Sequence, residues 1–161
     1  MKVRFANIND IDQLIQLRFD YFAADNYKVT DEMRTVISSQ LAEYYKKHLN
    51  LDFYAALVED DGRIVSSAFL VISEMPANTH CPTGKYGKIL NVHTFEQYRR
   101  KGYAAAAMNL LIEEAKRQDL SYIELSASEM GKALYEKLGF KESYSSYVPM
   151  KLKLFKAEDD V

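Results

Sequence analysis

Cysteine is nearly absent from this sequence of 161 residues, because Cys81 is the only one. A single cysteine cannot form an intrachain disulfide bond, which agrees with a reducing compartment. No apolar run approaches the roughly 20 residues that a membrane-spanning helix needs, and the first ten residues turn polar too early for a secretory signal peptide. We therefore expect a cytoplasmic protein without a membrane partner.

An excess of positive charge is also missing, since 21 Lys and Arg residues stand against 23 Asp and Glu residues. Bulk charge therefore gives no support to nucleic-acid binding, and we expect neither a nucleic-acid partner nor a metal site. Internal repeats and low-complexity linkers are absent. With 48% hydrophobic residues, residues 1–161 should fold as a single domain with its own core.

Hydrophobic periodicity predicts mixed helices and strands in the order β-α-α-β-β-β-α-β-α-β, with one further strand suggested near residues 143–147. The fold class is therefore α/β, or mixed α+β, with a mostly antiparallel central sheet flanked by helices. The strand–helix–strand passage over 86–126 is long enough for a right-handed parallel crossover. Strands are expected at 2–6, 53–60, 63–73, 87–95, 122–128 and 147–155, and helices from 9–10, from 30–31, at 102–118 and at 131–140.

Apolar spacing also predicts which faces of these elements are buried. In the last strand, Met150, Leu152 and Leu154 alternate with Lys151 and Lys153, so one face should be solvated. The buried stripes expected on the first two helices are Ile11, Leu14, Ile15 and Phe22, and then Met33, Val36, Ile37, Leu41 and Tyr44.

The stretch "QYRRKGYAAAAMNLL" at 97–111 places a basic cluster, a glycine and four alanines at the start of an expected helix. A helix N-terminus has unpaired N–H groups and partial positive charge, so it can bind phosphate. Gly102 lets an anion approach the backbone, and Ala104 keeps a nearby position small. Arginine can bind phosphate through two bonds. A pyrophosphate-binding turn is one interpretation, and an ordinary turn with solvated charges is the other.

The stretch matches neither the P-loop nor the dinucleotide fingerprint. Instead, "NVHTFEQYRRKGYAAAAMNLL" resembles the central motif of the GNAT superfamily of N-acetyltransferases, R/Q-x-x-G-x-G/A, through Arg99, Gly102 and Ala104. "SEMGKALYEKLGF" at 128–140 resembles the family segment N-x-x-A-x-x-L-Y-x-K-L-G-F. The order of elements agrees as well. The resemblance thus covers nearly the whole chain and implies the GNAT-like acyl-CoA N-acyltransferase fold.

The resemblance also implies acetyl-CoA as the acetyl donor and indicates the residues that hold it. In the family, the strand before the turn splays from the next parallel strand, and pantetheine lies in the gap against exposed backbone. The turn's amides hold the pyrophosphate. Ser128 stands where relatives often have an asparagine, and its hydroxyl has a shorter reach. The matching positions are Val92, Thr94, Arg99, Arg100, Lys101, Gly102, Tyr103, Ala104, Ser128 and Tyr135.

For catalysis, Tyr135 matches the tyrosine that the family often uses near the thioester sulfur. A phenol with a pKa near ~10 can donate a proton to a leaving thiolate, although Tyr135 could instead be a core aromatic. Some relatives carry Glu or His as a base where this chain has Lys88, a cation and a poor base. Glu74 and His93 are the substitutes, each of which could equally be structural, and water relayed to bulk solvent is a third option.

The resemblance places the acceptor amine among the first two helices, the loop at 75–86 and the closing strands. Tyr21, Phe22, Asp25 and Tyr27 at the turn between those helices could form an aromatic, partly acidic pocket for it, and Glu74 is expected to contact it as well. Tyr21 and Phe22 could equally be core. Cys81 is treated as incidental, because the family needs no cysteine nucleophile.

The function implied is an acetyl-CoA-dependent N-acetyltransferase that transfers directly to a primary amine of a small molecule or peptide. The alternative is a non-catalytic CoA-binding sensor or regulatory module with the same fold. An enzyme that uses another nucleotide would require both motifs to be coincidental. The resemblance also allows a homodimer.

Overall fold

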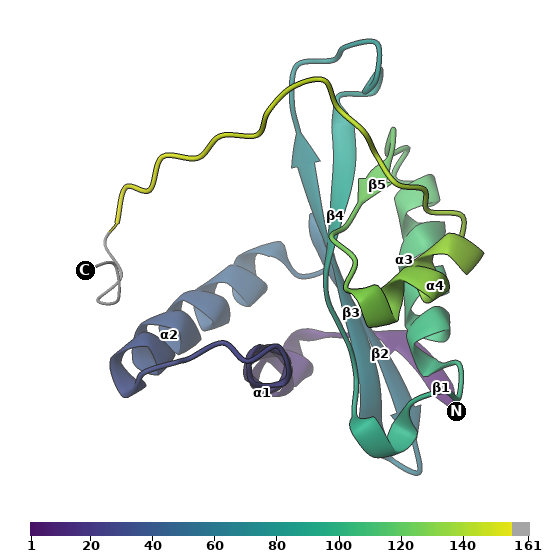
Figure 1. Ribbon diagram of the computed structural model, residues 1–161. Coiled ribbons are helices and arrows are strands. Elements are labelled where there is room, and N and C mark those ends of the chain that lie inside the picture. The colour runs from purple at the N-terminus through teal and green to yellow at the C-terminus, as the bar shows by residue number, and fades with distance from the viewer. Residues whose placement is uncertain (156–161) are drawn as a thin grey trace.

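The computed structural model describes residues 1–155, which form a five-stranded sheet with helices on both faces (Figure 1). Helices α1 and α2 cover one face, and α3 and α4 lie on the other. The elements, in chain order, are β1 (Lys2–Phe5), η1 (Ile8–Asp10), α1 (Ile11–Ala24), α2 (Asp31–His48), β2 (Phe53–Asp60), β3 (Arg63–Glu74), β4 (Lys85–Thr94), η2 (Glu96–Tyr98), α3 (Tyr103–Arg117), β5 (Ile123–Glu124) and α4 (Glu129–Lys137).

The strands lie in sequence order across the sheet, β1-β2-β3-β4-β5. Strands β1 to β4 pair antiparallel, and β5 pairs parallel to β4 after the crossover through α3. The predicted fold class, a mixed and mostly antiparallel sheet flanked by helices, is therefore confirmed, and so is the parallel crossover.

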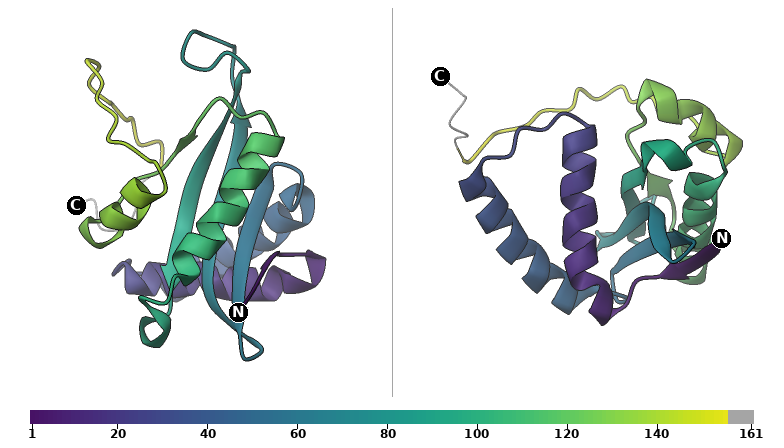
Figure 2. Two further views of the ribbon diagram at one scale, coloured as in Figure 1. Left: turned by 90° about the vertical axis from the view of Figure 1, so that its right-hand side faces the viewer. Right: turned by 90° about the horizontal axis from the view of Figure 1, so that it is seen from below.

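Both faces of the central strands are buried, which produces two separate cores (Figure 2). On one face Met108 and Leu111 of α3 pack with Leu70 and its neighbours. On the other face Leu14 of α1 and Tyr45 of α2 pack around the aromatic residues of β2 and β3. With a helix layer on each side, β2 and β3 carry almost continuous apolar runs instead of alternating patterns.

The predicted helix starts are close to the observed ones, but the predicted stripes are partly wrong. Thr30 caps α2 by accepting a hydrogen bond from the Met33 N–H at 3.2 Å. Met33 and Val36 are nevertheless 39% and 69% exposed, because the N-terminal half of α2 extends past the sheet (Figure 1). The residues actually buried are Ile11, Leu14, Leu17 and Phe19 on α1, and Leu41 and Tyr45 on α2.

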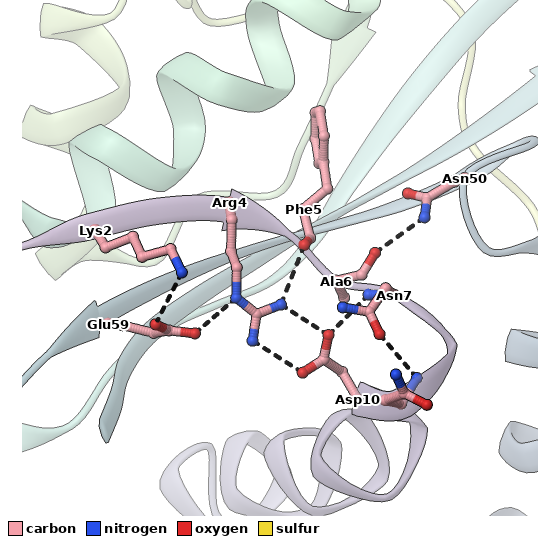
Figure 3. A network of polar contacts seen from close by, with 9 residues as sticks. Lys2, Arg4, Phe5, Ala6, Asn7, Asp10, Asn50 and Glu59 are labelled. Carbon is pink, nitrogen blue, oxygen red and sulfur yellow. Dashed lines mark hydrogen bonds and ion pairs between the residues drawn. The ribbon is translucent and has the colours of Figure 1, made fainter. Parts of the chain in front are cut away.

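A polar network fixes the entry of the chain into α1 (Figure 3). The Arg4 guanidinium donates to both carboxylate oxygens of Asp10, at 2.7 and 2.9 Å, and to Glu59 on β2 at 2.6 Å. The Asp10 carboxylate also accepts from the Asn7 N–H at 2.8 Å, and Arg4 holds the pKa of this carboxyl below its usual value. Asn7 caps η1, and Asp10 stands at the N-cap position of α1 without making a side-chain cap bond there.

The predicted closing strand at 147–155 is wrong for the single chain, as is the further strand near 143–147. Residues 141–155 belong to no helix or strand, and every one of them is exposed. They leave α4 and run beyond the sheet to the α2 side (Figure 1). A strand needs a neighbouring backbone to pair with, and the path of this segment provides none.

Candidate functional site

Strands β4 and β5 are paired at one end only. Gly87 lies opposite Ile123 and Lys88 opposite Glu124, and the pairing stops there. Residues 89–94 of β4 therefore have no strand partner on the β5 side within the described part of the chain. An unpaired strand edge presents N–H and C=O groups to any extended ligand that enters the gap.

A cleft of about 180 Å³ opens where the pairing ends. Its walls come from the C-terminal half of β4, the end of α1, and the segment that leads from β5 into α4. The predicted site residues that it brings together are Tyr21, Val92, His93, Thr94, Arg99, Ser128 and Tyr135. Three parts of the chain that are distant in sequence thus meet at the place that the motifs indicated.

A β-bulge shapes the β4 wall of the cleft. Phe69 pairs with Leu90 and Ser67 with His93, so two residues of β4 lie opposite one residue of β3. The bulged Asn91 is buried at φ +56°. Its side-chain oxygen accepts from the Arg18 guanidinium at 3.3 Å, and its amide donates to the backbone of α1.

Asn91 lines the cleft although it was not among the predicted site residues. The available signal was a polar residue inside the apolar run "ILNV", of a type that tolerates positive φ better than most. The bulge matters because it changes which face of β4 the following side chains occupy. Val92 packs toward α3, and His93 contacts the ring of Phe95, with 5.0 Å between the ring centroids.

The basic turn and the N-terminus of α3 lie beside this cleft, since Arg99 lines it. Gly102, the N-cap residue, has φ +81°, and no side chain caps the helix. The first helical hydrogen bond runs from the Ala106 N–H to the Gly102 carbonyl at 3.0 Å, so the N–H groups before Ala106 have no intrahelical acceptor. A Cβ on Gly102 would meet no atom within 4 Å, so the turn is open to a ligand.

The side chains of the turn point in different directions. Arg99 donates from Nε to the Thr94 carbonyl at 3.2 Å, and Lys101 lies 5.5 Å from the ring centroid of Tyr98. The ring of Tyr103 is buried, and its hydroxyl donates to Asp60 at 2.5 Å. Of the predicted cofactor contacts in the turn, Tyr103 can therefore offer only its backbone N–H, whereas Arg99, Arg100 and Lys101 have exposed side chains.

Tyr135 of α4 forms the wall of the cleft opposite β4. Its ring is partly buried and meets Phe140 edge to face at 6.0 Å between centroids. Burial, with a smaller contribution from Tyr21, raises the pKa of the Tyr135 phenol. The group is therefore protonated at neutral pH, as a proton donor must be. Ser128 caps α4 by accepting from the Gly131 N–H at 3.1 Å, and its own O–H remains able to donate.

Of the two predicted bases, only His93 lies in the cleft. Burial lowers the pKa of this imidazole, and the Asp20 carboxylate partly opposes that effect, so His93 is neutral at pH 7 and can accept a proton. Glu74 is exposed at the end of β3 and lies opposite Lys85 of β4 in the strand register. That position is four residues along β4 from Ile89, where the cleft begins, or about 13 Å at strand spacing.

The residues predicted to bind the acceptor are only partly in the cleft. Tyr21 lines it, and so does Asp25, the residue that follows α1. Phe22 and Tyr27 do not line it. The Arg18 guanidinium lies over the Phe22 ring, 4.6 Å from the ring centroid, and the largely exposed Tyr27 ring contacts the Phe22 ring edge to face. A carboxylate and a phenol thus face the α1 end of the cleft, a suitable combination for a cationic amine.

No helix within residues 1–155 is both long enough and apolar enough to cross a membrane. Nor, in the same residues, does any group of three or more His, Cys, Asp or Glu side chains have an arrangement that could hold a metal ion.

Comparison with known proteins agrees with this geometry. A family model described as "Acetyltransferase (GNAT) family" matches residues 11–140, whereas a comparison with curated proteins finds no match. Among solved structures, a predicted acetyltransferase with acetyl-CoA from Clostridium acetobutylicum is similar with a TM-score of 0.81 and 25% identity, covering 93% of this chain and 95% of that one.

Two other similar structures support the fold alone, given their lower identity. A GCN5-related N-acetyltransferase from Ralstonia eutropha JMP134 has a TM-score of 0.76 at 22% identity, with 92% of this chain and 97% of that chain covered. Glucosamine-6-phosphate N-acetyltransferase from Arabidopsis thaliana has a TM-score of 0.66 at 21% identity, with 96% and 98% covered.

Proposed function

Because the chain belongs to the GNAT family of acetyltransferases, we propose that it transfers an acetyl group from acetyl-CoA directly to a primary amine of a small molecule or peptide. The observation that carries the proposal is the cleft between β4 and α4, which has Tyr135 on one wall and the uncapped N-terminus of α3 close by. Membership in the family supports acyl transfer in general. The residues of the cleft support acetyl-CoA as the donor and an amine as the acceptor.

The residues present fit acetyl-CoA. The uncapped amides of α3, the open space at Gly102 and the exposed cations of the turn are suited to a pyrophosphate, and the unpaired edge of β4 is suited to the amide groups of pantetheine. When bound, acetyl-CoA supplies a thioester whose acyl carbon is open to attack by a neutral amine.

The reaction forms an amide C–N bond and breaks a C–S bond, so one proton must leave the amine and one must reach the sulfur. In our proposal Tyr135 donates the second proton, because its raised pKa keeps the phenol protonated. Neutral His93 accepts the first. Tyr21 and Asp25 hold the amine at the α1 end of the cleft.

The role of His93 predicts a specific pH dependence. Since burial lowers its pKa from 6.5, the base form is present at pH 7 and is lost as the pH falls through that lowered pKa. We expect kcat/KM to be level at pH 7 and to fall only at a pH lower than the ordinary histidine pKa. His93→Gln should reduce kcat/KM by about 10²-fold and remove this limb. Initial rates between pH 5 and 9 give the profile.

The acceptor's own ionisation provides the control for this profile. A limb caused by the amine moves when an acceptor of different pKa is used, whereas a limb caused by His93 stays in place. A wild-type profile whose only acidic limb follows the acceptor would exclude His93 as the base and favour water relayed to bulk solvent.

Ligand-dependent thermal unfolding tests the proposed donor. A ligand at ~100 times its Kd adds about 2.7 kcal/mol to the free energy of unfolding, which should raise Tm by roughly 5–10 °C in a domain of this size. We expect this shift with acetyl-CoA and with CoA but not with ATP. Equal shifts with ATP, or none with millimolar acetyl-CoA, would refute the proposal. A shift without acetylation of any amine offered would favour a CoA sensor.

A further inference from the structure

Arg18 of α1 is a half-buried cation that no carboxylate accompanies. Among residues 1–155 it forms no ion pair, and its hydrogen-bond acceptor there is the side-chain oxygen of Asn91 at 3.3 Å. Arg4, which is also half-buried, is paired with two carboxylates. Buried charges are normally paired, because burial of an unpaired charge is costly. Arg18 therefore has hydrogen-bond donors left for an anion.

Aromatic side chains, and not carboxylates, surround Arg18. Its guanidinium carbon lies 4.6 Å from the ring centroid of Phe22 and 5.9 Å from that of Tyr21. Burial lowers the pKa of the guanidinium, and the groups that oppose this effect are the phenols of Tyr45, Tyr21 and Tyr27. A phenol ionises only near pH 10 or above, so these groups leave the cation unneutralised at neutral pH.

Tyr45 of α2 adds an unused donor near this cation. Its ring packs against Phe53 and is only 2% exposed, yet its hydroxyl has no hydrogen-bond partner within residues 1–155. Burial raises the pKa of this phenol, and the nearby Arg18 partly opposes that effect, so the O–H is protonated at neutral pH. The guanidinium and the phenol together offer donors that an anionic oxygen can accept from.

The Arg18 guanidinium lies directly behind the wall of the cleft. It contacts Asn91 and the ring of Tyr21, and both of these residues line the cleft. Asp25 lines the cleft as well, and burial together with the Asp25 carboxylate raises the pKa of the Tyr21 phenol. Tyr21 therefore lies near both a carboxylate and a guanidinium. A ligand that carries an ammonium group and an anionic group matches this pair of charges.

We propose that the acceptor carries a carboxylate or a phosphate close to its amine, and that Arg18 binds this anionic group while Tyr21 and Asp25 hold the amine. This specificity rests on the proposed function, because it concerns the acceptor of the same cleft. A planar guanidinium forms two parallel hydrogen bonds with either kind of anion, and the Tyr45 hydroxyl donates a third. The two charges of the acceptor are close together, as in an amino acid or an amino-alcohol phosphate.

Matched pairs of acceptors test the preference for an anionic group. Each common amino acid is paired with its amide, and phosphates of amino alcohols and amino sugars are paired with their unphosphorylated forms. Rates are compared per neutral amine, because the anionic group also changes the pKa of the amine. We expect kcat/KM to be at least about tenfold higher for the best anionic acceptor than for its neutral partner, the effect of a hydrogen bond to a charged group. The preferred pair tells a carboxylate from a phosphate.

Arg18→Gln separates recognition of the anion from support of the fold. It should lower kcat/KM for the best anionic acceptor by about 10- to 100-fold and for its neutral partner by less than about threefold, so the preference disappears. An arginine that only holds Asn91 in place would affect both acceptors equally. Arg34→Gln is the matched control, because Arg34 lies 4.2 Å from the ring centroid of Phe19 and does not line the cleft. This control should keep the preference.

Binding gives a readout that needs no acetyl transfer. With CoA present, the best anionic acceptor should raise the Tm of the wild type and of Arg34→Gln but not that of Arg18→Gln. If Arg18→Gln does not fold, Arg18→Lys serves instead, because it keeps the charge but loses the two parallel bonds and should show a reduced preference.

Three outcomes would overturn the anion site. Neutral amines could be acetylated as well as their anionic partners, in which case the proposed function stands without this specificity. The preference could be the same in wild type and Arg18→Gln, or no anionic compound could be either bound or acetylated. If acetyl-CoA binds but no compound of either kind is acetylated, the proposed function fails, and the Tm shifts alone decide whether Arg18 binds an anion.

Discussion

Tyr135→Phe should lower kcat by about 10²- to 10⁴-fold, the usual contribution of a general acid, and should change the Kd for acetyl-CoA by less than about threefold. Phenylalanine keeps the ring that packs against Phe140 and lines the cleft, so binding should survive. The variant lacks only the hydroxyl, which in our proposal gives its proton to the sulfur. Steady-state rates of CoA release and calorimetric binding of acetyl-CoA separate the two effects.

Tyr86→Phe is the matched control for this experiment. Tyr86 lies on β4, stacks on Tyr122 and does not line the cleft, so removal of its hydroxyl should leave kcat within about twofold. The acceptor should be the best substrate from a panel of amino acids, polyamines, aminoglycosides, amino sugars and a lysine-containing peptide. Equal turnover by wild type and Tyr135→Phe would remove this residue from the mechanism.

The pH profile of kcat gives a second readout for Tyr135. Burial raises the pKa of the phenol above 10, so the acid form persists through neutral and mildly alkaline pH and is lost only as the pH rises past that raised value. The wild-type profile should therefore stay flat up to about pH 10 on its alkaline side. A decline between pH 8 and 9 that Tyr135→Phe abolishes would contradict the raised pKa.

Short-range motifs predicted the location of the cleft because they encode local backbone geometry. A glycine at positive φ, an uncapped helix start and a serine cap depend on a few neighbouring residues. The structure accordingly has Gly102 at the N-cap of α3 and Arg99 and Ser128 on the wall of the cleft. Their individual roles in binding stay predictions until they are measured.

Features that depend on distant parts of the chain were harder to predict. The bulge at Asn91 exists because α1 supplies partners for its amide, the Leu17 carbonyl and the Arg18 guanidinium, and the pattern of β4 alone does not contain that information. The exposure of Val36 similarly depends on how far α2 extends past the sheet. Glu74 was a reasonable base from sequence, but the register of β3 against β4 separates it from the cleft.

The closing strand illustrates a third kind of limit. Alternation over residues 147–155 predicts that a strand forms, but it carries no information about which chain supplies the neighbouring strand. The single chain leaves that segment exposed and leaves the edge of β5 free.

Gly102→Val should weaken acetyl-CoA binding by roughly 10- to 100-fold, the value of losing one hydrogen bond between a backbone amide and a charged oxygen, about 1.5–3 kcal/mol. Gly102 has φ +81°, which a β-branched residue adopts only with strain. Its missing Cβ faces open space beside the free amides of α3. Valine would fill the space that an approaching phosphate needs and would distort the turn that aims the amides.

Gly62→Val separates this effect from general backbone strain. Gly62 has φ +73° in the β2–β3 turn, and like Gly102 it has no atom within 4 Å of an added Cβ. Both variants should therefore lose a similar stability, about 1–3 kcal/mol, while Gly62→Val keeps its affinity for acetyl-CoA. Calorimetric titration with acetyl-CoA, alongside urea unfolding, measures both quantities. Unchanged affinity for acetyl-CoA in Gly102→Val would mean that the turn does not hold the pyrophosphate. An equal loss of this affinity in both variants would mean that backbone strain alone causes it.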